Sequence, residues 1–202
     1  MSMELVLATG NAGKLREIAV MLDGLALNVR AQSHYGVSAV EETGTTFVEN
    51  AIIKARHAAR HSGCPALADD SGLAVDALAG APGVYSARYA GVDASDTDNV
   101  HKLLANSAHL PDTARVCRFV CVMVALRDAD DPLPLMASGI WVGQLLRAPR
   151  GEGGFGYDPI FGVPGHGCSS AELPAALKNE LSHRGQALRA LRSLLVAAPA
   201  WR

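Results

Sequence analysis

The chain has 202 residues, of which 49% are hydrophobic and 19% are charged, and its formal net charge is −2. This composition is ordinary for a globular protein and excludes disorder over most of the chain. A net charge so close to zero argues against a general binder of nucleic acid or of membrane surfaces. It does not exclude a local basic pocket for a small anion.

Three features of the sequence bear on where in the cell the protein is located. The longest uncharged apolar run covers residues 119–126, whereas a membrane-spanning helix needs about twenty residues. Residues 1–4 lack the positive charge that opens a signal peptide. The cysteines form no CxxC pair, and we expect them to be reduced thiols. We therefore expect a cytoplasmic protein.

The first predicted elements are a strand, a loop and a helix. Residues 4–8 are typical of a short strand, and residues 9–14 form a glycine-containing loop. The helix is indicated by apolar residues at i, i+3, i+4 and i+7, namely Leu15, Ile18, Ala19 and Leu22. Gly24 suits its end.

A second helix is predicted to begin with the capping box Thr46-Phe47-Val48-Glu49 and to end at Gly63. A short strand over residues 66–68 runs into Asp69-Asp70-Ser71-Gly72, and residues 73–75 could continue it. After a glycine-rich loop, Val100, Leu103 and Leu104 indicate a short helix.

The second half of the chain predicts a long antiparallel hairpin, with strands over residues 115–127 and 136–146. A second glycine-rich loop covers residues 151–162, and a helix follows around Leu188, Leu191 and Leu195. We therefore predict an α/β fold with a mixed central sheet and flanking helices, rather than a purely parallel doubly wound sheet.

The loop at residues 9–14 is the first candidate site. Backbone N–H groups and the helix dipole favour an anion where a strand leads into a helix, and Lys14 adds a full positive charge. The spacing matches neither a P-loop nor GxGxxG. The loop is therefore either a phosphate site or an ordinary tight turn.

Acidic residues form the second candidate site: Glu41, Glu42, Asp69 and Asp70. Carboxylates at the end of a strand suit Mg²⁺, and one of them could be the base that activates a water molecule. The alternative is a set of solvated loop acids. The apolar strand that leads into Asp69 favours the site, because ligand sites in α/β folds collect at the carboxyl ends of strands.

The loop at residues 153–159 is the third candidate. It could present Phe155 to a flat ligand, and Asp158 could accept a hydrogen bond from a base. Alternatively, Phe155 and Tyr157 are core residues of a glycine-rich turn.

The fourth candidate combines Lys178 with the start of the last helix. Ser182 could cap that helix, which would place His183 and Arg184 at its positive end. The alternative is a capped and solvated helix start.

Five segments together resemble the non-canonical purine nucleoside triphosphate pyrophosphatases, the inosine/xanthosine triphosphate family. They are LATGNAGKLREI (7–18), EETGTTFVENAIIKARHAA (41–59), ADDSGLAVDALAGAPGVYSARYAG (68–91), GGFGYDPIF (153–161) and SHRGQAL (182–188). The resemblance implies a single domain over residues 1–202, with two lobes around an active-site cleft, and a homodimer. It also implies Mg²⁺-dependent hydrolysis of ITP, dITP or XTP to the monophosphate and pyrophosphate.

The resemblance also implies roles for individual residues. Glu42 and Asp70 would hold Mg²⁺, and Asp70 would be the catalytic acid or base. The triphosphate would bind Thr9, Gly10, Asn11, Ala12, Gly13 and Lys14. Ser71 would touch the substrate, and the base and remaining phosphate contacts would be Phe155, Gly156, Tyr157, Asp158, Lys178, His183 and Arg184.

One segment departs from the family pattern, because residues 167–173 lack a lysine that bacterial members usually have. Two other functions stay open at this point. One is a pyrophosphatase for other modified nucleotides, including pyrimidines. The other is a nucleotide-binding regulator without turnover.

Overall fold

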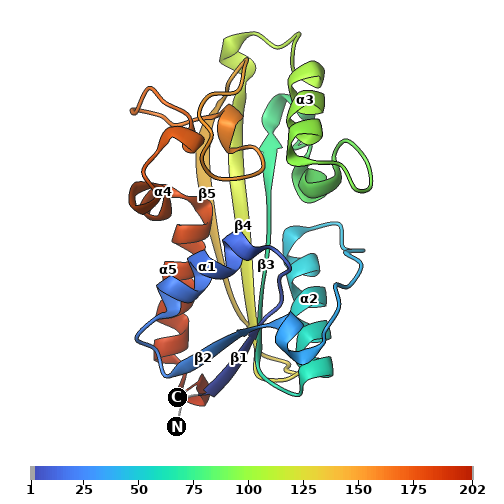
Figure 1. Ribbon diagram of the computed structural model, residues 1–202, viewed down its shortest axis with the longest axis vertical. Helices are drawn as coiled ribbons and strands as arrows, with labels where there is room; N and C mark the ends of the chain where they lie inside the picture. The colour runs from blue at the N-terminus through green and yellow to red at the C-terminus, as the bar shows by residue number, and fades with distance from the viewer. Residues whose placement is uncertain (1–2, 202) are drawn as a thin grey trace. The chain divides into compact units, whose positions relative to one another are not determined.

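The computed structural model describes residues 3–201, which form one six-stranded sheet with helices packed against it (Figure 1). The strands follow the order β2-β1-β3-β4-β5-β6. Strand β1 is parallel to β2 and β3, and β5 is antiparallel to β6. The predicted mixed α/β sheet with flanking helices is therefore confirmed.

The strands are β1 (Met3–Leu7), β2 (Leu27–Ala31), β3 (Ala66–Val75), β4 (Val116–Leu126), β5 (Leu135–Leu145) and β6 (Phe161–Gly162). The α-helices are α1 (Ala12–Leu22), α2 (Phe47–Ser62), α3 (Asp96–Asn106), α4 (Ala175–Leu181) and α5 (His183–Ala197). None of the helices within residues 3–201 is both long enough and apolar enough to cross a membrane.

The chain divides into two compact units. The first comprises Met1–Asp70, Cys121–Gly139 and Gln186–Arg202, and the second comprises Ser71–Val120 and Ile140–Gly185. Strands β3, β4 and β5 and helix α5 contribute residues to both units. Each unit has its own hydrophobic core, and each is described by itself below.

The core of the first unit lies on both faces of β1, because successive residues of a strand point to opposite faces. Leu5 and Leu7 pack into a cluster with residues of α1 and α5. Val6 packs into a second cluster with the small buried face of α2, which consists of Ala51, Ala55, Ala58 and Ala59. Both predicted helices are confirmed, including the capping box at Thr46 and the left-handed Gly63 that ends α2.

The core of the second unit is aromatic. The Phe119 and Phe161 ring centroids are 4.6 Å apart, and those of Trp141 and Phe161 are 4.7 Å apart. Beside this core the Arg115 side chain is 2% exposed and donates to three backbone carbonyls, those of Ser107, Leu145 and Leu146. The guanidinium thus joins the end of α3 to the end of β5.

Four elements differ from the sequence prediction. Strand β2 lies in a stretch that we did not assign to any element, and the two-residue strand β6 lies at the end of the predicted glycine-rich loop. Strand β3 continues without a break from Ala66 to Val75, so Asp69 and Asp70 lie inside a strand and not at its end. Tertiary ion pairs hold both carboxylates there, which overrides the low strand propensity of aspartate. Helix α4 was not predicted, because a segment of seven residues is too short to show a helical period.

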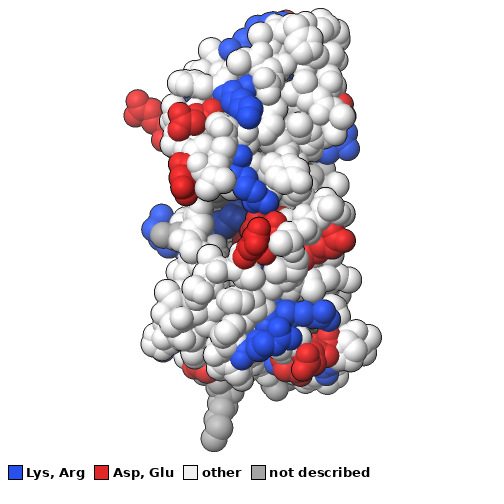
Figure 2. Space-filling view, turned by 90° about the vertical axis from the view of Figure 1, so that its right-hand side faces the viewer, with Lys and Arg blue, Asp and Glu red and all other residues white. Residues whose placement is uncertain are grey.

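On the face of the molecule that Figure 2 draws, basic and acidic side chains are interspersed rather than gathered by sign. This agrees with the net charge of −2. The four cysteines are free thiols, and two of them, Cys117 and Cys121, are buried in β4.

Candidate active site

The loop between β1 and α1 belongs to the first unit, and Asn11 sets its conformation. The Asn11 side chain caps α1, because its Oδ1 accepts from the backbone N–H groups of Gly13 (2.8 Å) and Lys14 (3.0 Å). The Thr9 hydroxyl accepts from the backbone N–H of Asn11 at 3.1 Å. Gly10 is exposed, and Ala12 is the first residue of α1. The backbone N–H groups of Gly13 and Lys14 are therefore already bonded to the cap.

Lys14 extends from α1 to Asp69 in β3. Its Nζ lies 2.8 Å from Asp69 Oδ2, and the side chain of Asp69 is 1% exposed. Because neighbouring residues of a strand point to opposite faces, the side chains of Asp69 and Asp70 leave β3 in opposite directions. Asp69 pairs with a lysine of α1, whereas Asp70 pairs with a lysine of α2.

Lys54 of α2 bridges two carboxylates that the sequence placed in the same candidate site. Its Nζ lies 2.7 Å from Glu42 Oε1 and 2.8 Å from Asp70 Oδ1. All three side chains are mostly buried, with exposed fractions of 15% for Lys54, 24% for Glu42 and 8% for Asp70. The structure therefore brings Glu42 and Asp70 together around one cation.

The buried setting changes how these groups titrate. Burial raises the pKa of Asp70 above its ordinary value, although the neighbouring ammonium of Lys54 opposes the rise. Burial alone would lower the pKa of Lys54, but the negative charges of Asp70, Asp69 and Glu42 outweigh burial and raise that pKa. Asp70 is therefore a stronger base than an exposed aspartate, and Lys54 stays charged beside it.

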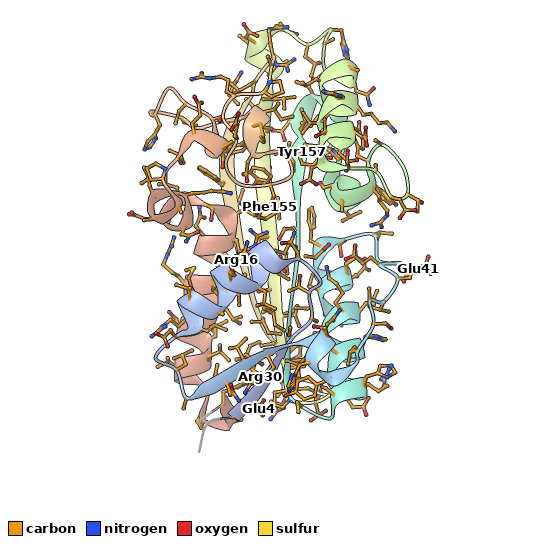
Figure 3. All side chains as sticks on the ribbon, in the orientation of Figure 1. Glu4, Arg16, Arg30, Glu41, Phe155 and Tyr157 are labelled. Atoms are coloured by element: carbon orange, nitrogen blue, oxygen red, sulfur yellow. The ribbon has the colours of Figure 1, made fainter. Side chains whose placement is uncertain are left out.

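Asn50 connects this cluster to the loop before α2. Its Nδ2 lies 3.4 Å from Asp70 Oδ2, and its Oδ1 accepts from the backbone N–H of Gly44 at 2.8 Å. Asn50 is fully buried. Glu41, the neighbour of Glu42, is exposed, and in Figure 3 it projects from the outer edge of this loop. The structure thus separates Glu41 from Glu42, Asp69 and Asp70.

A second cluster, in the second unit, is organised by Asp158. Its Oδ2 accepts from the Phe155 backbone N–H (2.9 Å) and from Lys178 Nζ (2.6 Å), while its Oδ1 accepts from the Ser170 hydroxyl (2.9 Å). Asp158 is 4% exposed. We expected this carboxylate to accept a hydrogen bond from a base. Its three protein donors fix the carboxylate, which in turn positions Lys178.

Phe155 lies beside two cations. Lys178 Nζ and the Arg184 guanidinium carbon are each 5.3 Å from the centroid of its ring. The ring is half-buried, which leaves part of it exposed, whereas Tyr157 on the same loop is buried. Figure 3 labels both residues. The Tyr157 hydroxyl donates to the Ser86 carbonyl at 2.8 Å. Of the two aromatic residues, Phe155 is thus the one placed to stack on a ligand, and Tyr157 anchors the loop in the core.

The start of α5 completes the second cluster. Ser182 caps this helix, because its hydroxyl accepts from the Gly185 backbone N–H at 3.0 Å. His183 and Arg184 follow, and both residues are buried, with exposed fractions of 6% and 5%. The His183 ring stacks on Phe119, with centroids 4.7 Å apart and an interplanar angle of 11°. Ser71, the remaining predicted residue, is half-buried in β3 and begins the second unit.

Sequence reasoning missed three residues of these clusters: Asn50, Lys54 and Ser170. Asn50 and Lys54 are four residues apart and so lie on one side of α2. In the sequence, both could have been found as polar residues beside the buried alanines of α2. Ser170 gave no such signal, because its segment has no regular period.

Comparison with known proteins decides the family. The sequence profile of the Ham1 family matches residues 5–194. The chain belongs to the Ham1 family. The resemblance that we inferred from five separate segments is thus confirmed.

Relatives in this family are similar over nearly their whole length. A protein of Shigella flexneri named dITP/XTP pyrophosphatase is 58% identical over 188 residues, which cover 93% of this chain and 95% of that protein. A protein of the same name from Vibrio parahaemolyticus is 57% identical over 197 residues, 98% of each chain. The solved structure of a HAM1 protein from Coxiella burnetii matches this chain with a TM-score of 0.92 and 49% identity. The match covers 97% of this chain and 100% of the Coxiella chain.

Proposed function

We propose that this protein hydrolyses non-canonical purine nucleoside triphosphates, namely dITP, ITP and XTP, to the monophosphate and pyrophosphate. Such an enzyme removes deaminated purines from the nucleotide pool. The relatives named dITP/XTP pyrophosphatase support this activity. The observation that carries the mechanism is the buried Asp70, whose raised pKa suits a general base.

The first unit supplies the groups for the phosphate chemistry. Asp70 accepts a proton from the attacking water, and the water oxygen forms its new bond to the α-phosphorus. The bond from that phosphorus to the bridging oxygen breaks, and pyrophosphate leaves. Lys14 and the helix dipole at the N-terminus of α1 attract the phosphate oxygens. The loop around these oxygens consists of Thr9, Gly10, Asn11, Ala12 and Gly13. Lys54 holds the carboxylates of Glu42 and Asp70 in place.

The carboxylate oxygens of Glu42 and Asp70, in the first unit, fit Mg²⁺ as ligands. Oxygens of Glu42 and Asp70 lie within 2.7 and 2.8 Å of one cation, the Lys54 ammonium, and Mg²⁺ binds through one or two carboxylates with water as its other ligands. Within residues 3–201, no three His, Cys, Asp or Glu side chains converge on one point. When bound to Glu42 and Asp70, Mg²⁺ would neutralise charge on the phosphates.

The second unit supplies the groups for the base. Phe155 stacks on the purine, and Gly156, Tyr157 and Asp158 shape the loop that presents it. Lys178, fixed by Asp158, donates to the 6-oxo group of hypoxanthine or xanthine. Adenine has a 6-amino donor there, so it would leave the Lys178 donor unpaired and would be rejected. Ser71, His183 and Arg184 make the other contacts with the nucleotide, and Arg184 binds phosphate.

The remaining properties rest on the family resemblance. We propose a homodimer, a cytoplasmic location, and a substrate that is a free nucleotide and neither a nucleic acid nor a membrane lipid. The single domain with two lobes belongs to the same proposal.

The chemistry is tested by the products that the wild-type protein and Asp70→Asn release from dITP in the presence of Mg²⁺. We expect pyrophosphate and dIMP from the wild-type protein. Asparagine cannot accept the proton, so turnover by Asp70→Asn should fall by at least about 100-fold. Orthophosphate as the first product would contradict attack at the α-phosphorus, and near-normal turnover by the variant would exclude Asp70 as the base.

A further inference from the structure

The loop that carries Phe155 is tied to a helix distant in sequence. The backbone N–H of Gly156 donates to Asp96 Oδ2 at 2.7 Å. Asp96 is the first residue of α3, and both residues belong to the second unit. This carboxylate was not among the residues that the sequence motifs singled out.

Asp96 is distinct from the residues that cap α3. The capping box of that helix consists of Ser95 and Asp98, whose carboxylate accepts from the Ser95 backbone N–H at 3.0 Å and from its hydroxyl at 2.6 Å. Asp96 instead reaches the Phe155 loop. At the N-terminus of an eleven-residue helix, the helix dipole favours a carboxylate.

The hydrogen bond acts on the peptide unit that follows Phe155. Gly156 has a φ of +60°, so the chain turns sharply at this point. Asp158 accepts from the N–H of Phe155 itself, and Asp96 accepts from the N–H of the next residue, Gly156. The two carboxylates together fix the backbone on both sides of the Phe155 side chain.

We propose that Asp96 is a positioning residue that sets the orientation of Phe155 for stacking on the purine. This inference rests on the proposed function, which assigns Phe155 to the base. It goes beyond that function, because it adds a residue of α3 that touches neither phosphate nor base. Since the bond needs only an acceptor oxygen, asparagine at this position can replace aspartate.

The experiment compares Asp96→Ala, Asp96→Asn and the matched control Asp98→Ala. For each protein, kcat and KM are measured with dITP, the dissociation constant of the product dIMP is measured by calorimetry, and thermal unfolding is followed. Loss of one hydrogen bond to a charged acceptor at an exposed site is worth about a two- to tenfold change in affinity. For Asp96→Ala we therefore expect KM and the dIMP dissociation constant each to rise about two- to tenfold. The value of kcat should stay unchanged.

The other variants separate positioning from helix stability. Asp96→Asn should stay within about twofold of the wild-type protein, because its amide oxygen accepts the same hydrogen bond. Asp98→Ala breaks the capping box, so its unfolding temperature should fall while its KM stays at the wild-type value. Wild-type KM and dIMP affinity in Asp96→Ala would overturn the proposal. A KM in Asp98→Ala as high as in Asp96→Ala would also overturn it.

The binding measurement keeps this inference separate from the proposed activity. If the wild-type protein binds dIMP but releases no pyrophosphate from dITP, the proposed activity fails, and the dIMP affinities still decide the role of Asp96. If the wild-type protein binds no dIMP, the proposed role of Asp96 in base recognition is overturned as well.

Discussion

Replacing Lys54 by methionine tests whether this lysine holds the buried carboxylates of Glu42 and Asp70. Methionine keeps most of the length and apolar contact of the side chain but removes the ammonium. In Lys54→Met, two carboxylates that each lie within 2.8 Å of the lysine nitrogen lose their shared counter-charge. Breaking a buried ion pair by removing one partner costs about 3–5 kcal/mol of stability. We expect the free energy of unfolding at pH 8 to fall by this amount.

The cost should depend on pH, because Asp70 can be protonated. Without Lys54 the pKa of Asp70 rises further above its unfolded value, so the charged carboxylate destabilises the folded state at high pH. Lowering the pH relieves the cost as the carboxylate takes up a proton. From an unfolded pKa of about 3.9 and about 1.36 kcal/mol per pH unit, protonation limits the cost from Asp70 to about 1.5 kcal/mol at pH 5.

Urea unfolding of the wild-type protein and Lys54→Met at pH 5 and pH 8 measures both effects. Lys102→Met is the matched control, since Lys102 also uses its ammonium for a hydrogen bond, to the Tyr89 carbonyl, but is exposed. That control should change stability by less than about 1 kcal/mol at either pH. A deficit in Lys54→Met below about 1 kcal/mol at pH 8, or one equal at both pH values, would refute the reasoning.

Two further predictions concern the stability of individual sites. Gly154→Ala would place a Cβ in steric overlap with Asp158 Oδ2 at a φ of +76°, whereas Gly156→Ala meets nothing within 4 Å at a φ of +60°. Urea unfolding should therefore show a loss of stability at least about 1 kcal/mol larger for Gly154→Ala, and equal losses would contradict the crowding around Asp158. Hydrogen bonds from Arg127 hold the pKa of the buried Asp131 well below its ordinary range, so its charge stabilises the fold above about pH 4. The free energy of unfolding of Asp131→Asn should be about 1–3 kcal/mol below that of the wild-type protein at pH 7. This difference should become smaller as the pH falls from 5 to 2. A difference that stays constant over that range would show that the charge of Asp131 contributes nothing.

The longer helices and the hairpin of this fold were predictable because their signals are local. The capping box at Thr46, the left-handed glycine after α2 and the spacing of Leu15, Ile18 and Leu22 each act within a few residues. The long β4–β5 hairpin followed from two apolar runs around a polar turn. The continuous strand β3 was less visible, because two aspartates interrupt its apolar pattern. Their lysine partners come from helices far away in the sequence, so a local pattern could not show them.

The candidate site was predictable in its residues more than in its contacts. The motifs pointed to Asp70, Glu42 and Lys14, and the structure pairs each of them with an opposite charge. The part played by Lys54 depends on where α2 packs, which its own sequence does not reveal. Asp158 shows the same limit, because the donors that surround it come from three separate segments of the chain.

Pyrophosphate release by the purified protein tests the central claim most directly. With Mg²⁺ present, kcat/KM would be measured for dITP, XTP and dATP, with Asp70→Asn as the inactive control. Because adenine leaves the donor of Lys178 unpaired, we predict that kcat/KM for dITP and XTP exceeds that for dATP by at least about 100-fold. Equal rates for dITP and dATP, or no pyrophosphate from any of the three, would contradict the account.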